Sequence, residues 1–211
     1  MQGHLIDDLI QQGFLKTPNI IKAFKKIKRT DFVLTEDYLR ADEDAPLEIG
    51  YGQTISQPLT VAFMLELLEP QPGEKILDVG SGSGWTVALL AEIVGLKGKV
   101  FGLEIIPELA EYATTNVAKY NFIEEGRVKI ICHNAYQGLP NEAPFDKIIV
   151  AAAAVSLPKE LLNELKIGGH LVIPIGREMN MQEIVAIDKI SLEQYRERRF
   201  PGFIFVPLVK G

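Results

Sequence analysis

The strongest constraint on the fold is a glycine-rich segment that follows a short apolar run. Residues 76–84 read ILDVGSGSG, and residues 85–94 continue with helical apolar spacing. Glycine lets the backbone take positive φ and lets a ligand approach the main chain closely. A helix that begins directly after such a loop presents unpaired N–H groups and a partial positive charge. The segment predicts a strand, a ligand-binding loop and a helix in succession.

The alternation of strand and helix continues along the chain. Apolar runs predict strands at 75–79, 100–104, 128–131, 147–151 and 170–174, and helices at 85–94, 107–120 and 157–165. Two later runs, 183–190 and 203–208, predict strands with no helix between them. The pattern favours an α/β fold, a Rossmann-like doubly wound, mostly parallel sheet with an antiparallel C-terminal strand pair.

The first 70 residues have a different character. Apolar spacing of three and four predicts helices at 4–15, 18–29 and 58–69, and the polar, glycine-rich stretch 41–57 predicts an ordered loop. A chain of 211 residues fits a single domain. We expect one domain over 1–211, with an N-terminal helical extension and the polar loop in 1–70 and a ligand-binding α/β core in 71–211.

Charge and composition exclude several functions. The net charge of -6 disfavours non-specific nucleic-acid binding, so the basic cluster at 25–29 is expected to be a solvated helix face. The N-terminus lacks the pattern of a signal peptide, and no uncharged stretch approaches the ~18 residues of a membrane span. The lone Cys132 fits a reducing compartment and is predicted to be buried. We expect a cytoplasmic protein without a membrane partner.

The spacing of the glycines selects among ligands. A dinucleotide loop needs G-x-G-x-x-G, which would place the third glycine at position 85, where the chain has Trp85. A nucleoside triphosphate loop needs a lysine after its last glycine, and no lysine follows here. The G-x-G-x-G spacing resembles motif I of the S-adenosylmethionine-dependent methyltransferases. Asp78 suits a ligand that carries an ammonium, and Glu104, at the end of the next strand, can accept from both hydroxyls of a ribose. A purely structural glycine turn is the alternative.

A second motif precedes this loop. Residues 49–58 read IGYGQTISQP and resemble the signature I-G-x-G-Q-T-I-S-x-P of the protein-L-isoaspartate O-methyltransferases. Further segments resemble that family in the same order: 31–33 (DFV), 46–47 (PL), 138–140 (GLP), 143–146 (APFD), 148–150 (IIV), 165–176, Gln182 and 205–208 (FVPL). The resemblance therefore covers nearly the whole chain.

The resemblance implies a role for each matching residue. It places Ser56 at the methyl-transfer site, with a pocket for the substrate shaped by Gln53, Thr54, Ile55 and Gln57. It assigns the cofactor S-adenosylmethionine, which leaves as S-adenosylhomocysteine, to Asp78, Gly80, Ser81, Gly82, Gly84, Glu104, Asn134, Ala135 and Gln182. The substrate peptide would lie along Val206, Pro207 and Leu208, and no metal is expected. Alternatively, Thr54 and Ser56 are turn residues that make local hydrogen bonds.

The chain departs from the family pattern at a few positions. Tyr51 stands where the family commonly has His, and Ala151 where Thr is usual. Asn134 and Ala135 lie in HNA, where the family commonly has G-D-G. Asn keeps an acceptor but loses the charge, and Ala requires a negative φ. The departures at 134, 135 and 151 bear on cofactor affinity more than on substrate identity.

The implied acceptor is the α-carboxylate of an isoaspartyl residue in a protein or peptide. A carboxylate is ionised at pH 7, so no general base is required. His4, His133 and His170 are accordingly scattered and lack partners at a triad spacing. The resulting methyl ester would collapse to a succinimide. A monomer is expected. Two alternatives stay open: a methyltransferase of the same fold acting on a small molecule or RNA, and a cofactor-binding module without catalysis.

Overall fold

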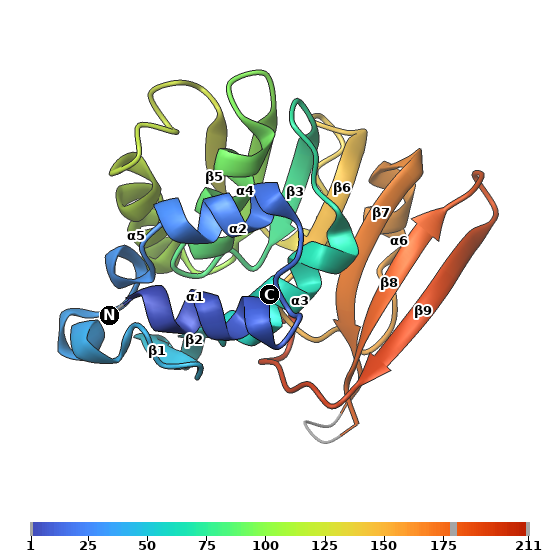
Figure 1. Ribbon diagram of the computed structural model, residues 1–211. Helices are drawn as coiled ribbons and strands as arrows, with labels where there is room; N and C mark the ends of the chain where they lie inside the picture. Colours follow the sequence, from blue (N-terminus) through green and yellow to red (C-terminus); the bar gives the residue numbers. More distant parts are fainter. Residues whose placement is uncertain (1, 178–180, 210–211) are drawn as a thin grey trace.

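A mostly parallel sheet organises the molecule. The computed structural model describes residues 2–177 and 181–209, within which seven strands form one sheet in the order β5-β4-β3-β6-β7-β8-β9 (Figure 1). The strands are β3 (Lys75–Val79), β4 (Lys99–Glu104), β5 (Val128–Cys132), β6 (Phe145–Val150), β7 (Leu165–Ile175), β8 (Glu183–Lys189) and β9 (Tyr195–Pro201). Strands β3 to β7 pair in parallel, while β8 pairs antiparallel with both β7 and β9. The predicted fold class is confirmed.

Each central strand is buried on both faces because successive side chains point to opposite sides. In β3, Ile76 packs into the larger apolar core and Leu77 into the smaller one. The larger core lies under the helices α1 (Gln2–Gln11), α2 (Pro18–Lys26), α3 (Pro58–Leu68), α4 (Trp85–Val94) and α5 (Pro107–Ala118) (Figure 1). On the opposite face, α6 (Lys159–Glu164) lies against β7, and the short 3-10 helix η3 (Ala135–Gln137) lies against α6.

The antiparallel end of the sheet differs from the prediction in its last strand. The partner of β8 is β9, with the sequence YRERRFP, and not the apolar run 203–208. That run crosses the carboxyl ends of the parallel strands, where Ala153 donates its N–H to the Val206 carbonyl and accepts from the Leu208 N–H, both at 2.8 Å. The prediction was wrong because β9 is an exposed edge strand whose charged side chains leave no apolar periodicity.

The predicted ordered loop at 41–57 contains a β-hairpin. Strands β1 (Leu47–Gly50) and β2 (Gln53–Ile55) pair antiparallel, and the buried Leu47 and Ile55 face each other across the pair. The turn residues Tyr51 and Gly52 both have positive φ, at 56° and 69°, as tight hairpin turns require. Tyr51 is 60% exposed at the tip of the hairpin. Two short 3-10 helices, η1 (Arg29–Phe32) and η2 (Thr35–Arg40), lead into this hairpin.

Cys132 is exposed, so the prediction that it is buried was wrong. It is the last residue of β5, which lies at an edge of the sheet. None of the helices in the described part of the chain combines the length and apolarity needed to cross a bilayer.

Candidate active site

The glycine loop turns sharply at the end of β3. Gly80, Gly82 and Gly84 all have positive φ, at 78°, 53° and 88°. The N–H of Gly80 donates to the Leu103 carbonyl at 2.8 Å, which ties the start of the loop to β4. A Cβ on Gly84 would lie 2.9 Å from Cγ2 of Val117, so a side chain there would push α4 away from α5. The loop therefore needs glycine both for its backbone and for helix packing.

Two acidic residues stand at the ends of β3 and β4. Asp78 is fully buried, and neither of its carboxyl oxygens has a hydrogen-bond partner among the described residues. Burial, and then the charge of Glu104, raise the pKa of Asp78 to about 8. The Glu104 carboxylate accepts from the N–H of Gly82 at 2.9 Å and from those of Ile105 and Ile106 at 2.8 and 3.0 Å. A buried carboxyl without a partner suits a ligand that brings positive charge.

A cavity opens at the carboxyl ends of β3, β4 and β6. We call it the main cavity. It is lined by Gln53, Thr54, Ile55, Ser56, Val79, Gly80, Ser81, Gly82, Ser83, Trp85, Thr86, Leu103, Glu104, Ile105, His133, Ala135, Ala151, Ala152, Val206, Pro207, Leu208 and Val209. The predicted site residues in this lining are Gln53, Thr54, Ile55, Ser56, Gly80, Ser81, Gly82, Glu104, Ala135, Val206, Pro207 and Leu208.

The other predicted site residues lie close by but outside this lining. Asp78 lies buried at the end of β3, and Gly84 packs against α5. Asn134 caps η3, where its Oδ1 accepts from the Tyr136 N–H at 2.9 Å. Gln57 lines an adjoining groove, and the Gln182 side chain binds the backbone of Phe205.

A second hollow, which we call the groove, adjoins the main cavity. Its lining is Pro46, Thr54, Ser56, Gln57, Leu59, Thr60, Ala151, Gly202, Phe203, Ile204, Phe205 and Val206. Four residues, Thr54, Ser56, Ala151 and Val206, line both hollows. Ser56 therefore lies where the main cavity meets the groove.

Sequence reasoning missed several residues near the site. Trp85, Thr86, His133 and Val209 line the main cavity without having been predicted as ligand contacts. Trp85 and Thr86 follow the glycine loop directly, and this adjacency was the available signal.

The basic cluster at 25–29 was only partly understood from the sequence. Lys25, Lys26 and Lys28 are exposed as expected, but Arg29 is only 3% exposed. For Arg29 the prediction of a solvated face was wrong, because its guanidinium is enclosed by carbonyl groups of the acidic loop at 41–45 and by Ser56.

The comparison with protein families agrees with this geometry. The model of the family described as protein-L-isoaspartate(D-aspartate) O-methyltransferase matches residues 1–211. The chain belongs to this family. The protein-L-isoaspartate O-methyltransferase of Aeropyrum pernix is 45% identical over 97% of this chain and 78% of its own length. That of Pyrobaculum islandicum is 43% identical over 99% of both chains.

A solved structure has the same fold over its whole length. The Plasmodium falciparum protein assigned as a protein-L-isoaspartate O-methyltransferase, crystallised in complex with S-adenosyl-L-homocysteine, superposes with a TM-score of 0.87. It is 28% identical, and the match covers 98% of this chain and 97% of the other. Among the family departures, Ala135 lies in the 3-10 helix η3, where φ is negative, so alanine brings no backbone strain there.

Proposed function

We infer that this chain is a protein-repair methyltransferase that transfers a methyl group from S-adenosylmethionine to the free α-carboxylate of L-isoaspartyl residues in damaged proteins. The observation that carries this function is the position of Ser56 at the junction of two hollows. A donor in the main cavity and an acceptor in the groove would meet at this residue. Membership of the family selects the isoaspartyl carboxylate among the acceptors that such a junction admits.

The residues around the main cavity fit S-adenosylmethionine. The unpartnered carboxyl of Asp78 lies at the end of β3, where the ammonium of the cofactor would supply the missing charge. Oε2 of Glu104 accepts one hydrogen bond, from Gly82, and keeps a lone pair for a ribose hydroxyl. When bound, the cofactor supplies an activated methyl group on a sulfonium centre.

The reaction needs positioning more than proton transfer. The acceptor carboxylate is ionised at pH 7, so no side chain has to remove a proton from it. Ser56 would donate a hydrogen bond to this carboxylate and orient one oxygen toward the methyl group. Ile55 and Leu103 contribute apolar surface to the lining, which would limit the water beside the reacting groups. Orientation of this kind contributes up to about 7–11 kcal/mol in favourable cases. The backbone amide nitrogen of the following residue would then attack the ester carbonyl and expel methanol, which gives a succinimide whose hydrolysis returns some normal aspartate.

The remaining assignments follow from this role. Residues 1–70 would supply the substrate loop and residues 71–211 the cofactor core of one domain. The substrate peptide would lie extended along Val206, Pro207 and Leu208, at the border of the two hollows. We propose a cytoplasmic monomer whose partners are isoaspartyl proteins and peptides, with no role for nucleic acid or membrane.

The test is transfer of labelled methyl from S-adenosylmethionine to two synthetic peptides that differ only in an aspartyl or isoaspartyl linkage. We expect base-labile label on the isoaspartyl peptide alone. Label on an RNA or small-molecule acceptor instead, or cofactor binding without transfer to any acceptor, would contradict the proposal.

A further inference from the structure

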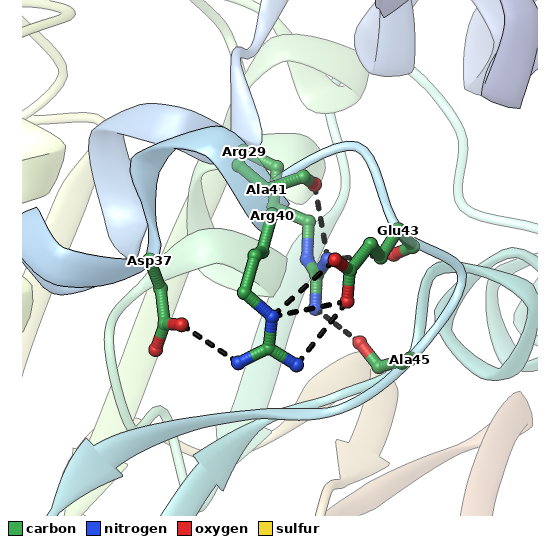
Figure 2. A network of polar contacts seen from close by, with 6 residues as sticks. All are labelled: Arg29, Asp37, Arg40, Ala41, Glu43 and Ala45. Atoms are coloured by element: carbon green, nitrogen blue, oxygen red, sulfur yellow. Dashed lines mark hydrogen bonds and ion pairs between the residues drawn. The ribbon is translucent and has the colours of Figure 1, made fainter.

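The buried guanidinium of Arg29 donates hydrogen bonds to main-chain carbonyls of two loop segments. Nη1 of Arg29 donates to the carbonyls of Ala41 and Glu43, both at 3.0 Å. Nη2 donates to the carbonyls of Ala45 at 2.7 Å and Ser56 at 3.2 Å. Figure 2 shows the side chain reaching from η1 into the curve of the acidic loop. Four carbonyls from two segments therefore share one cation, and one of them belongs to the proposed catalytic residue.

The same acidic loop holds the chain on the other side of Ser56. Oδ1 of Asp44 accepts from the N–H of Leu59 at 2.8 Å, and Oδ2 accepts from Nε2 of Gln57 at 3.1 Å. These residues open α3, so Asp44 also supplies a carboxylate to the start of that helix. Ser56 is thus held from one direction through its own carbonyl and from the other through its neighbours.

The charge of Arg29 is kept despite its burial. Burial lowers the pKa of Arg29 to about 10, and four surrounding carboxylates act in the opposite direction: Asp44, Asp42, Glu43 and Asp37. The group stays protonated at pH 7. On the outer side of the loop, Arg40 pairs with Asp37 at 2.8 Å and with Glu43 at 3.2 Å (Figure 2). Two of the four acids, Asp37 and Glu43, therefore also have a second cation as partner.

Arg29 also contacts the wall of the main cavity. Its Cζ lies 5.4 Å from the centre of the Trp85 ring, which is within the range of a cation–π interaction. Trp85 begins α4 directly after the glycine loop and lines the main cavity. One side chain thus bridges the helix that follows the glycine loop and the hairpin end that carries Ser56.

We propose that Arg29 and Asp44 are positioning residues for methyl transfer, which set the place of Ser56 relative to the main cavity without contacting either substrate. This inference rests on the proposed function. A misplacement of about 1 Å at a reacting centre costs as much as roughly 100-fold in rate, so a loosened Ser56 should show in kcat.

The first test compares two acids of the loop. Asp44 is exposed, so Asp44→Ala should leave the fold intact while it removes both side-chain hydrogen bonds. We expect kcat for an isoaspartyl peptide to fall about tenfold, since the reacting groups lose alignment, with the cofactor Kd unchanged. Asp42→Ala is the matched control, because among the described residues Asp42 also acts on the charge of Arg29 but makes no hydrogen bond or ion pair with residues 56–59. Equal kcat in the two variants would overturn the proposal.

The second test compares two buried arginines. Arg127 is 8% exposed, donates to the Ala91 carbonyl and lies 4.7 Å over the Phe122 ring, away from the site. Arg29→Lys and Arg127→Lys should both lower the melting temperature, but only Arg29→Lys should lower kcat. Trp85 is the one tryptophan of the sequence, so its emission reports the loss of the guanidinium directly. An unchanged emission and kcat in Arg29→Lys would reject the role of Arg29.

Hydrogen exchange separates this inference from the proposed function. In Asp44→Ala, the amides of Gln57, Leu59 and Thr60 should exchange faster than in the wild type, and in Asp42→Ala they should not. Unchanged exchange in Asp44→Ala rejects the positioning role even if the wild type methylates isoaspartyl peptides. Faster exchange with a wild type that transfers no methyl group rejects the proposed function, and with it the claim that the contacts serve transfer.

Discussion

Gln182 and Phe205 exchange two hydrogen bonds across the carboxyl edge of the sheet. Nε2 of Gln182 donates to the Phe205 carbonyl at 3.2 Å, and the Phe205 N–H donates to Oε1 of Gln182 at 2.6 Å. Both residues are 6% exposed. An amide side chain thus replaces a strand as the partner of this segment. It holds residues 203–208 over the site at the border between the main cavity and the groove.

Gln182→Ala should loosen this segment and weaken peptide binding. The Phe205 N–H would be left buried without its partner, at a cost of about 1–3 kcal/mol. We expect KM for an isoaspartyl peptide to rise, with a smaller change in kcat and a lower melting temperature. Steady-state kinetics and thermal denaturation check this, with the exposed Gln71→Ala as control. A KM equal to that of the wild type would contradict a role for this segment in holding the peptide.

Ser56→Ala should impair transfer without affecting the cofactor. A hydrogen bond to a charged group contributes about 1.5–3 kcal/mol, so kcat/KM should fall by roughly 10- to 100-fold. The backbone carbonyl of residue 56 remains available to Arg29 in this variant, so the loop should keep its place. Calorimetric titration should give a cofactor Kd close to that of the wild type. Unchanged turnover would remove the Ser56 hydroxyl from the mechanism.

Asp78→Asn should stabilise the cofactor-free protein at high pH. The pKa of Asp78 is raised to about 8 in the folded protein, well above the unfolded value of about 3.9. Between these pH values the folded state holds a proton that the unfolded chain has lost, so the free energy of unfolding falls as the pH rises. Asn cannot ionise, so this fall disappears in the variant. We expect the melting temperature of the variant, relative to that of the wild type, to be higher at pH 8 than at pH 5.

The same substitution should weaken cofactor binding, because Asn has no charge to offer to an ammonium. Binding to the wild type near pH 7 should also release a proton from Asp78, which calorimetry in buffers of different ionisation enthalpy can measure. Identical melting curves of the wild type and Asp78→Asn between pH 5 and pH 8 would show that burial does not raise the pKa of Asp78.

Glu104→Gln should weaken cofactor binding through the loop as well as through the ribose. The substitution replaces one carboxylate oxygen by an amide group, which cannot accept from the N–H of Gly82 or from a hydroxyl. We expect the cofactor Kd to rise by roughly 10- to 100-fold, equivalent to about 1.5–3 kcal/mol. Glu108→Gln, on the exposed start of α5, is the matched control. Equal affinity in the two variants would contradict the assignment of Glu104.

Local patterns predicted the centre of the molecule well. The strand at 75–79 and the three glycines were found because a buried parallel strand reads as a continuous apolar run and the loop depends on its own residues. The last strand was misplaced because β9 is charged, while the apolar run at 203–208 buries Phe205 against other elements. An apolar run indicates burial, but it does not say which partner buries it.

The role of Arg29 could not be read from the sequence, because its partners are main-chain carbonyls. Every residue supplies a main-chain carbonyl, so the residue types at 41, 43, 45 and 56 do not indicate that their carbonyls accept from Arg29. Three exposed lysines in the same cluster also made a solvated arginine the simpler interpretation. Only the path of the acidic loop identifies which cation it encloses.

The charged strand β9 has a consequence for an enzyme that handles damaged chains. Extended segments with unpaired backbone groups can add themselves to an open sheet edge. Along β9, four consecutive charged residues, 196–199, stand exposed, and Pro201 ends the strand without an N–H to offer. Such an edge resists capture of a stray peptide as an eighth strand. The charged edge therefore disfavours co-aggregation of the enzyme with unfolded protein.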